Sequence, residues 1–512
     1  MERKWWTLVL ISIATFMLLM DVTVVNVALP EIERDLGASL SSLQWVVDAY
    51  SLMLAALLLT AGSLGDRLGR RRVFSIGLGV FTGASFLCGI SGDPTLLNLA
   101  RGLQGCGGAA MFATSLALIG QEFHGKDRAT AFGVWGATVG GAVAIGPLVG
   151  GVLTEGLGWE WIFFVNVPVG IAAIVLTERK LVNVAAQDPA GVDVPGLITF
   201  SGALFLLIFG LIRGNPEGWD SGVIVASLIG AVALMAIFVA IELRSPHPML
   251  DLGLFRNPAF VGVSAVAFGL SAGMFAMFLY LTIYLQGVLD YSPLEAGLRF
   301  LPFSLLSFFA APISGRLSHS VPIRYLLGTG LLLVGFGLVL MHGLSIDSGW
   351  TALLAGFLVA GLGTGIANPG IGQAAIGVVP VHKAGMGSGI NTSFRQVGIA
   401  TGVAGLGAVF QSQITSKIAE IAPAAPPQFA EGVAAGGSAA AARAVPQAAQ
   451  GVATRVADVA FVGALNEILV IAAVICFAAS ACGYLLVRPR DFVHAPQPGP
   501  EAQQPAAATE PA

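Results

Sequence analysis

Long apolar runs separated by short polar segments extend along almost the whole chain. Runs of roughly 18 to 30 residues are long enough to cross a bilayer as α-helices, and the pattern predicts about fourteen such spans. An even number of spans places both chain ends on one side of the membrane. The predicted spans are 5–28, 45–65, 73–91, 95–120, 129–153, 161–177, 194–213, 221–242, 259–287, 294–315, 323–342, 350–377, 385–411 and 459–487.

Composition excludes a soluble globular protein. Hydrophobic residues make up 55% of the 512 residues and charged residues only 11%, whereas about a quarter of the residues in a soluble domain are charged. We therefore expect an all-α membrane protein. The cysteines lack the C-x-x-C spacing of a redox or metal site, so neither a disulfide nor a metal is expected. They are Cys88, Cys106, Cys476 and Cys482.

The basic residues are distributed unevenly between the two sides of the predicted membrane. Of the 25 Lys and Arg residues, seventeen fall on the side of the N-terminus, five fall on the opposite side and three lie within spans. Cytoplasmic loops of membrane proteins carry an excess of Lys and Arg. We therefore expect a multi-pass protein of the cell membrane with both termini in the cytoplasm.

A short segment between the second and third spans, residues 62–74, reads G-S-L-G-D-R-L-G-R-R-R-V-F. Its glycines allow a tight reversal and close backbone approach, and an acid beside several arginines favours an ion-pair cluster at the water boundary. The plainer interpretation is a cytoplasmic anchor that obeys the positive-inside rule. The candidate residues of this segment are Gly62, Asp66, Arg67, Gly69, Arg70 and Arg71.

Two ionisable residues lie deep within predicted spans. A charge at membrane depth is costly and is tolerated mainly where it pairs or lines a cavity. Asp21 and Arg101 lie about eight and six residues from the same membrane face, or roughly 12 and 9 Å at 1.5 Å per residue. At matching depth they could share a proton-dependent site, in which protonation of the acid releases the cation. The alternative is a fixed structural ion pair.

Three stretches of the first half, which include the residues above, resemble signatures of the major facilitator superfamily. Residues 62–74 resemble its gating loop, in which the acid and arginines latch the two halves together. Residues 97–107, L-x-x-x-R-x-x-Q-G-x-G, resemble its fourth-span signature, whose arginine is implicated in proton transfer. Residues 21–30, D-x-T-x-x-N-x-A-L-P, resemble the first-span signature of drug:proton antiporters. The last two matches add Gln104 and Asn26 as candidate cavity residues.

The fifth predicted span resembles the motif g-x8-G-x3-G-P-x2-G-G, which is typical of exporters with this fold. Ala142 stands where the second glycine is usual, and alanine preserves the small-residue packing surface. The resemblance implies a hinge at Gly146, Pro147, Gly150 and Gly151, while ordinary packing of small residues is the alternative. The matching residues are Gly133, Gly146, Pro147, Gly150 and Gly151.

In the second half, residues 291–302 and 387–402 resemble stretches of fourteen-span drug:proton antiporters of the EmrB/QacA type, and the resemblance extends over about residues 5–487. Glu295, Arg299 and Arg395 are weaker candidates for the cavity or its outer mouth, and each could equally be an interfacial anchor. Asp48 is a further possible cation contact at the cavity or its mouth, and a helix-end acid that faces water is the alternative. The implied fold is a major facilitator fold. Its expected parts are a six-helix bundle at 1–180, two linker helices at 181–257, a second six-helix bundle at 258–490 with a long external loop near 412–458, and a disordered cytoplasmic tail at 491–512.

The resemblance implies a proton-coupled exporter of hydrophobic or amphipathic drugs and antibiotics from the cytoplasm or inner leaflet, with protons and membrane lipids as further partners. An exporter or flippase of a lipid-like or natural-product metabolite, with other or no ion coupling, is the alternative. Residues 120–127 contain G-x4-G-K, but Asp127 replaces the Ser or Thr that would bind magnesium. We expect no enzyme activity, cofactor, metal, nucleotide or nucleic acid.

Overall fold

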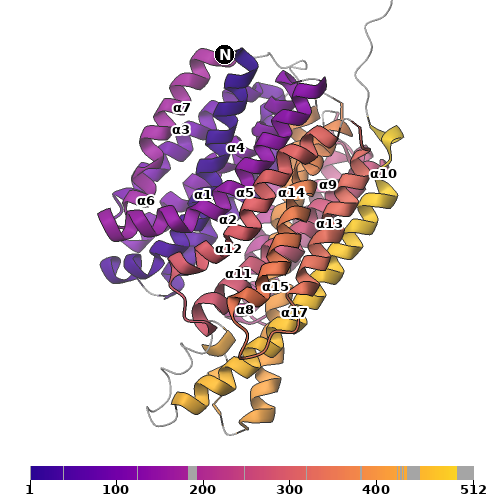
Figure 1. Ribbon diagram of the computed structural model, residues 1–512. Helices are drawn as coiled ribbons and strands as arrows, with labels where there is room; N and C mark the ends of the chain where they lie inside the picture. The colour runs from indigo at the N-terminus through magenta and orange to yellow at the C-terminus, as the bar shows by residue number, and fades with distance from the viewer. Residues whose placement is uncertain are drawn as a thin grey trace, which may run out of the picture.

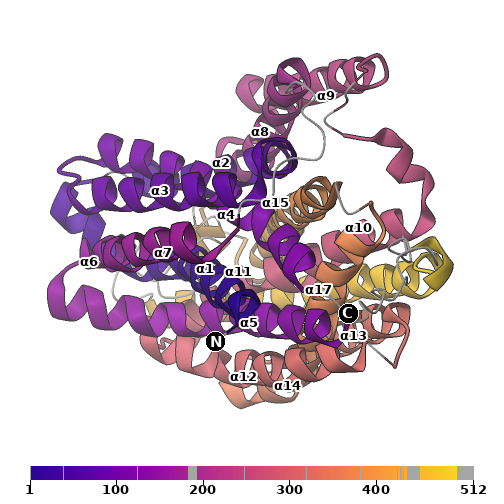
Figure 2. The same ribbon diagram turned by 90° about the horizontal axis from the view of Figure 1, so that it is seen from above.

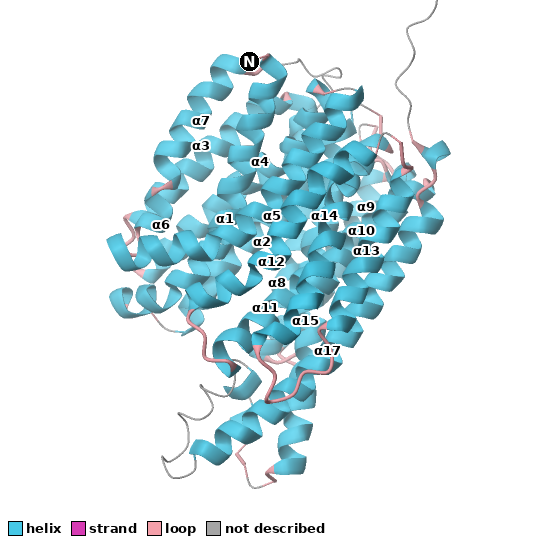
Figure 3. Ribbon diagram, viewed as in Figure 1, coloured by secondary structure: helices cyan, strands magenta, loops and turns pink. Residues whose placement is uncertain are grey.

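The computed structural model describes residues 2–38, 40–123, 125–182, 193–246, 248, 250–318, 320–380, 383–423, 425–426, 429–430, 432–434 and 450–492. Over these residues the chain is helical apart from short connections, and it contains no strand (Figure 3). Among the described residues, thirteen helices are long and apolar enough to cross a membrane. A further helix, α5 (Gly125–Leu157), has 33 residues and runs alongside them (Figure 1). The prediction of an all-α membrane protein with about fourteen spans is confirmed.

The N-terminal helices pack into one group. Within it α2 and α3 both lie along α4, and α1 lies along α5. The short α6 and the following α7 form one span together. The helices of this group are α1 (Arg3–Leu36), α2 (Leu40–Leu68), α3 (Arg70–Gly89), α4 (Pro94–Glu122), α5, α6 (Trp161–Phe164) and α7 (Asn166–Lys180).

The C-terminal helices form a second group around a large apolar core. Its first span is a continuous helix with two π-helical turns, made of α10 (Pro258–Leu270), η2 (Ser271–Phe275), α11 (Ala276–Ile283) and η3 (Tyr284–Val288). The other elements are α12 (Pro293–Leu317), α13 (Ile323–Leu340), η4 (Trp350–Leu353) with α14 (Leu354–Gly377), α15 (Ala384–Ile421), α17 (Gln450–Leu486) and η7 (Pro489–Asp491).

The two groups meet along two seams, where α5 packs on α12 and α2 packs on α15. Glycines allow the backbones to approach closely at both seams. A β-carbon at Gly133 of α5 would lie 2.8 Å from Cα of Pro312 in α12, and a β-carbon at Gly62 of α2 would overlap the carbonyl of Gly385 in α15. The small residues therefore set how tightly the halves close.

A hairpin of α8 (Val194–Glu217) and α9 (Gly222–Glu242) lies outside these groups and is followed by η1 (Leu252–Arg256) (Figure 2). Helix α8 packs against both α2 and α15. The Oγ atoms of Thr60 and Ser201 lie 2.8 Å apart, and Asn215 Nδ2 donates to the Ala404 carbonyl over 3.1 Å. The hairpin therefore covers the α2–α15 seam on the membrane side.

In the described part of the chain, two expected loops are largely helical. Residues 62–68 continue α2 and α3 begins at Arg70, so Gly69 alone, with φ of 98°, makes the turn. Near 412–458, α15 continues to Ile421 and α17 begins at Gln450. Apolar Ile414 and Ile418, one helical turn apart, are buried in the C-terminal core and carry α15 beyond the predicted span. The remainder of that loop between 435 and 449, and the tail from 493, lie outside the described residues.

Candidate functional site

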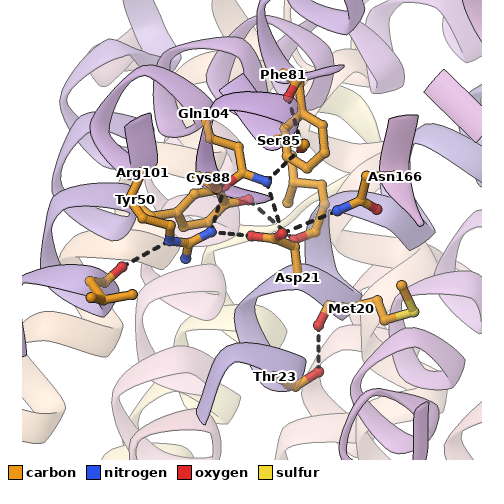
Figure 4. A network of polar contacts seen from close by, with 12 residues as sticks. Met20, Asp21, Thr23, Tyr50, Phe81, Ser85, Cys88, Arg101, Gln104 and Asn166 are labelled. Carbon is orange, nitrogen blue, oxygen red and sulfur yellow. Dashed lines mark hydrogen bonds and ion pairs between the residues drawn. The ribbon is translucent and has the colours of Figure 1, made fainter. Parts of the chain in front are cut away.

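Asp21 lies within α1, and its carboxylate forms an ion pair with the guanidinium of Arg101 from α4 (Figure 4). Two amides also bond this carboxylate. Gln104 Nε2 donates to Asp21 Oδ1 over 2.8 Å, and Asn166 Nδ2 at the start of α7 donates to the same oxygen over 3.2 Å. The side chains of Asp21 and Arg101 are each only 1% exposed. The structure thus brings together Asp21 and Arg101, which the sequence predicts to lie at matching depths in the membrane.

Arg101 has partners besides Asp21. Its Nε donates to the Val46 carbonyl over 2.8 Å and its Nη1 to Gln104 Oε1 over 2.7 Å. The guanidinium carbon lies 4.4 Å from the centroid of the Tyr50 ring, a distance at which the ring face attracts a cation. These contacts position the guanidinium independently of the charge on Asp21.

The amide of Gln104 has its orientation fixed by its neighbours. Its Oε1 accepts from Arg101, while its Nε2 donates to Ser85 Oγ over 2.9 Å as well as to Asp21. Asn166 differs, because its Oδ1 is buried without a hydrogen-bond partner. Sequence reasoning missed Asn166, although a polar residue inside the apolar run 161–177 was a usable signal.

A second cluster lies at the turn between α2 and α3. Asp66 Oδ1 accepts from Arg70 Nε and Nη2 over 3.0 and 2.9 Å. The same carboxylate accepts from the backbone amides of Gly385 and Met386, over 3.0 and 2.8 Å, in the first turn of α15. A carboxylate at a helix N-terminus is favourable because the helix dipole is positive there. One half-buried carboxylate therefore joins the two halves.

The other basic residues of that segment bind different elements. Arg70 Nη1 donates to the Ala117 carbonyl of α4 over 3.4 Å, and Arg71 forms an ion pair with Glu178 of α7. Arg67 Nη2 donates to the Pro248 carbonyl over 3.2 Å, between α9 and η1. The arginines thus connect the turn to the N-terminal helices and to the connection that follows the hairpin.

Two glycines of the exporter-like motif, Gly146 and Gly150, lie in the contact between α5 and α1. A β-carbon at Gly146 would overlap the side chain of Thr23, and one at Gly150 would lie 3.1 Å from the Val24 carbonyl. Gly151 has no atom within 4 Å of that position. The side chains of Pro147 and Asn26 lie outside the described part of the structure.

The weaker candidates lie apart from the Asp21 network. Asp48 Oδ2 is 3.8 Å from Nη1 of Arg213 in α8, and Arg395 Nη1 donates to Asn368 Oδ1 over 2.9 Å. Glu295 caps α12 by exchanging hydrogen bonds with Ser292. Arg299 lies 3.5 Å from the centroid of the Tyr291 ring. Glu295 and Arg299 therefore lie in the first two turns of α12, and the guanidinium carbon of Arg299 also lies 5.7 Å from the centroid of the Trp350 ring in η4.

Unpartnered polar atoms gather instead on α15. Asn391 is 2% exposed, and neither its Oδ1 nor its Nδ2 has a hydrogen-bond partner. Arg395 lies one helical turn further along α15, and its Nη2 also lacks a partner. Such buried groups are unfavourable unless something binds them. Over the described residues no group of three or more His, Cys, Asp or Glu side chains is arranged to hold a metal.

Residues 11–403 match the family model described as "Major Facilitator Superfamily". The chain is 38% identical over 425 residues to the "Puromycin resistance protein pur8" of Streptomyces alboniger, which covers 82% of this chain and 84% of that protein. It is 36% identical over 417 residues to the "Tetracenomycin C resistance and export protein" of Streptomyces glaucescens, covering 80% and 77%. A crystal structure of the human organic anion transporter MFSD10 (TETRAN) shares the fold, with TM-score 0.62 and 13% identity over 93% of this chain and 100% of that chain.

Proposed function

The chain belongs to the Major Facilitator Superfamily, and from that premise we propose that it exports amphipathic antibiotics or drugs across the cell membrane in exchange for protons. Relatives that match about four fifths of the chain are named for antibiotic resistance and export. The observation that carries the proton-coupled part is the buried Asp21 and Arg101 pair with its two amide partners. A transporter of this kind has a small-molecule substrate.

Coupling follows from the cost of an unpaired buried charge. While Asp21 is ionised, its charge compensates that of Arg101 within the N-terminal half. When Asp21 takes up a proton, Arg101 stays in place through its bonds to Val46 and Gln104 but loses its counter-charge. Leaving one member of a buried pair uncompensated destabilises a structure by about 3–5 kcal/mol. That is enough to favour a rearrangement that hydrates the guanidinium or gives it a new partner.

Asn166 is suited to follow the protonation of Asp21. While Asp21 is ionised, Asn166 Nδ2 donates a hydrogen bond to its carboxylate. A protonated carboxyl needs an acceptor, and rotation of the Asn166 amide by about 180° would present its oxygen, which has no other partner. Gln104 is held by Arg101 and Ser85 and is not free to turn. Asn166 therefore acts as a positioning residue for the proton site.

The Asp66 junction serves as the latch of the cycle. The contacts of Asp66 with the first turn of α15 hold the α2–α15 seam closed at the face where the chain begins. We assign this face to the cytoplasm from the distribution of basic residues. On this assignment, the closed seam prevents substrate from entering on the cytoplasmic side until Asp66 releases α15. The latch would join a bundle at 1–180 to one at 258–490, with 181–257 as the linker between them.

Two measurements test this proposal. A growth-inhibition panel of amphipathic antibiotics, including puromycin, should show raised resistance in cells that express the protein. Inverted membrane vesicles should then release a pre-formed proton gradient when an active compound is added, and Asp21→Asn should abolish that release. Glu33→Gln, an exposed acid on the same helix, is the control. Efflux that persists after the proton gradient is collapsed would favour an exporter with other or no ion coupling.

A further inference from the structure

A cavity of about 300 Å³ lies where α12 ends, α13 begins and the chain leaves α17. Its lining includes Ser318, Ser320, Ile323, Arg324 and Pro489. Because successive spans alternate in direction, this is the face on which the chain begins. The adjoining residues 318, 320–322 and 487–492 lie at the ends of membrane-spanning helices, so the cavity lies near the boundary between membrane and water.

The surroundings of the cavity are strongly basic. Among the described residues between 314 and 325 and between 486 and 492 there are four arginines and one acid, Asp491. Asp491 Oδ1 lies 3.7 Å from Nε of Arg490, and no acidic residue lines the cavity. The arginines are Arg316, Arg324, Arg488 and Arg490. The cavity therefore offers a net positive environment to a ligand.

Arg324 is the lining residue with unused hydrogen-bonding capacity. Its Nη2 donates to the Tyr325 hydroxyl over 2.6 Å, and its guanidinium carbon lies 4.5 Å from the centroid of the Tyr325 ring. Its Nε is buried and has no hydrogen-bond partner. The described residues contain no carboxylate paired with Arg324. A guanidinium carries five N–H donors, and Arg324 uses one of them for the Tyr325 hydroxyl, so it retains donors that suit a phosphate oxygen.

The N-terminus of α13 contributes to the same cavity. Pro322 is the N-cap residue and provides no side-chain hydrogen bond to the first turn. Ile323 and Arg324, the first two helical residues, line the cavity. Uncapped amides at the positive end of an 18-residue helix favour an anion. The helix terminus and the guanidinium are two independent features that select negative charge.

Apolar side chains beside the cavity indicate what carries that charge. Leu317 of α12 and Leu485 of α17 are 43% and 66% exposed, and Tyr325 is 42% exposed. Tyr side chains are typical of the membrane interface, and exposed leucines on spanning helices face lipid chains. Basic pockets between transmembrane helices on the cytoplasmic side bind anionic head groups. We infer that this cavity binds the phosphate of an anionic phospholipid, whose acyl chains lie along α12 and α17.

Native mass spectrometry of the purified full-length protein tests this site. The wild type, incubated with equal amounts of dioleoylphosphatidylglycerol and dioleoylphosphatidylcholine, should retain several-fold more of the former. Arg324→Gln should lower that retention about fivefold, since each basic residue near an anionic surface contributes about 1 kcal/mol. Arg244→Gln, which replaces an exposed arginine two residues beyond α9, should leave the retention unchanged. Equal retention of both lipids, or an unchanged Arg324→Gln variant, would overturn the inference.

Two further experiments test the same site, one with substitutions at Ser320 and one with a competing soluble phosphate. If Arg324→Gln does not fold, Ser320→Asp places a negative charge at the exposed rim of the cavity and should lower phosphatidylglycerol retention, whereas Ser320→Ala should not. Retention that is equal in Ser320→Asp and Ser320→Ala contradicts the site. Glycerol 3-phosphate distinguishes the two sources of phosphate. If it displaces phosphatidylglycerol at a comparable concentration, the ligand is a soluble phosphate and the lipid assignment is wrong.

Discussion

The carboxylate of Asp66 accepts a hydrogen bond of 2.8 Å from the backbone amide of Met386, 320 positions later in the chain. The bond crosses the seam between the halves and adds to the favourable position of a negative charge at the N-terminus of α15. The release of this contact is therefore a necessary part of any cycle that opens the seam on this face. The relationship also gives a direct way to change the balance between closed and open states.

Asp66→Asn should destabilise the closed seam. The amide keeps one acceptor but loses the charge, which is worth about 1–2 kcal/mol at a partly buried helix terminus. Turnover should fall about five- to thirtyfold while equilibrium binding of substrate survives. Transport rates and binding measured on the same preparation decide this, with Arg72→Gln as the control because Arg72 is exposed. Lost binding with normal turnover of the bound substrate would contradict the latch.

The sequence could predict the spanning helices from the lengths of the apolar runs. It could also predict Arg101 as the partner of Asp21, because the two residues lie at matching depths in their spans. It could not predict that Asp66 bonds α15, since the partners are backbone amides of Gly385 and Met386, which leave no side-chain signature. The apolar run 194–213 ends at Arg213. Helix α8 continues to Glu217 and turns Arg213 toward Asp48, which is a consequence of packing that hydropathy does not report.

Gly146→Ala should impair the protein far more than Gly151→Ala. The new methyl group at 146 would overlap Thr23 of α1, whereas at 151 it would enter open space. Overpacking of this kind typically costs about 1–3 kcal/mol. Thermal unfolding in detergent and efflux rates of the two variants form a matched comparison on one helix. Equal behaviour of the two alanine variants would show that α1 and α5 are not held in this close contact.

Asp251 and Lys383 provide a test outside the membrane. The Lys383 ammonium donates to the Asp251 carboxylate over 3.0 Å, and this bond, followed by that from the Gly253 amide, holds the pKa of Asp251 below its usual value. Because the folded-state pKa is lowered, the ionised carboxylate stabilises the protein above the usual carboxyl pKa near 4, and this contribution is lost as pH falls through the lowered pKa. Because the Asp251 side chain is 39% exposed, the effect should stay below about 1 kcal/mol.

The Asp251→Asn variant should therefore unfold at a slightly lower temperature than the wild type at pH 7, and the difference should shrink as the pH falls below about 4. Added salt should shrink the difference at pH 7, since exposed ion pairs are screened. Thermal unfolding of both proteins at two pH values and two salt concentrations provides the measurement. A difference that grows on acidification would mean that the carboxylate destabilises the connection between α9 and α10.

Asn166→Asp should move the pH dependence of efflux to higher pH. The substitution places a second carboxylate where the Asn166 amide now lies, 3.2 Å from Asp21 Oδ1. Two carboxylates at that separation cannot both ionise readily, so the pair retains a proton under more alkaline conditions than a single acid. Asn166→Leu removes both the donor and the acceptor. Hydrogen bonds to charged groups are worth about 1.5–3 kcal/mol, so proton-driven efflux should fall tenfold or more.

Efflux between about pH 5 and 9, measured for the wild type and both variants, separates a role at the proton site from one in packing. A purely structural Asn166 would lower the rate in both variants and leave the shape of the pH profile unchanged. Asn98→Asp is a suitable control, because Asn98 lies on α4 and donates to the Ser42 carbonyl over 3.3 Å, apart from the Asp21 carboxylate. A shift in Asn166→Asp without one in Asn98→Asp would support Asn166 as the amide that accommodates both protonation states of Asp21, and equal shifts would reject it.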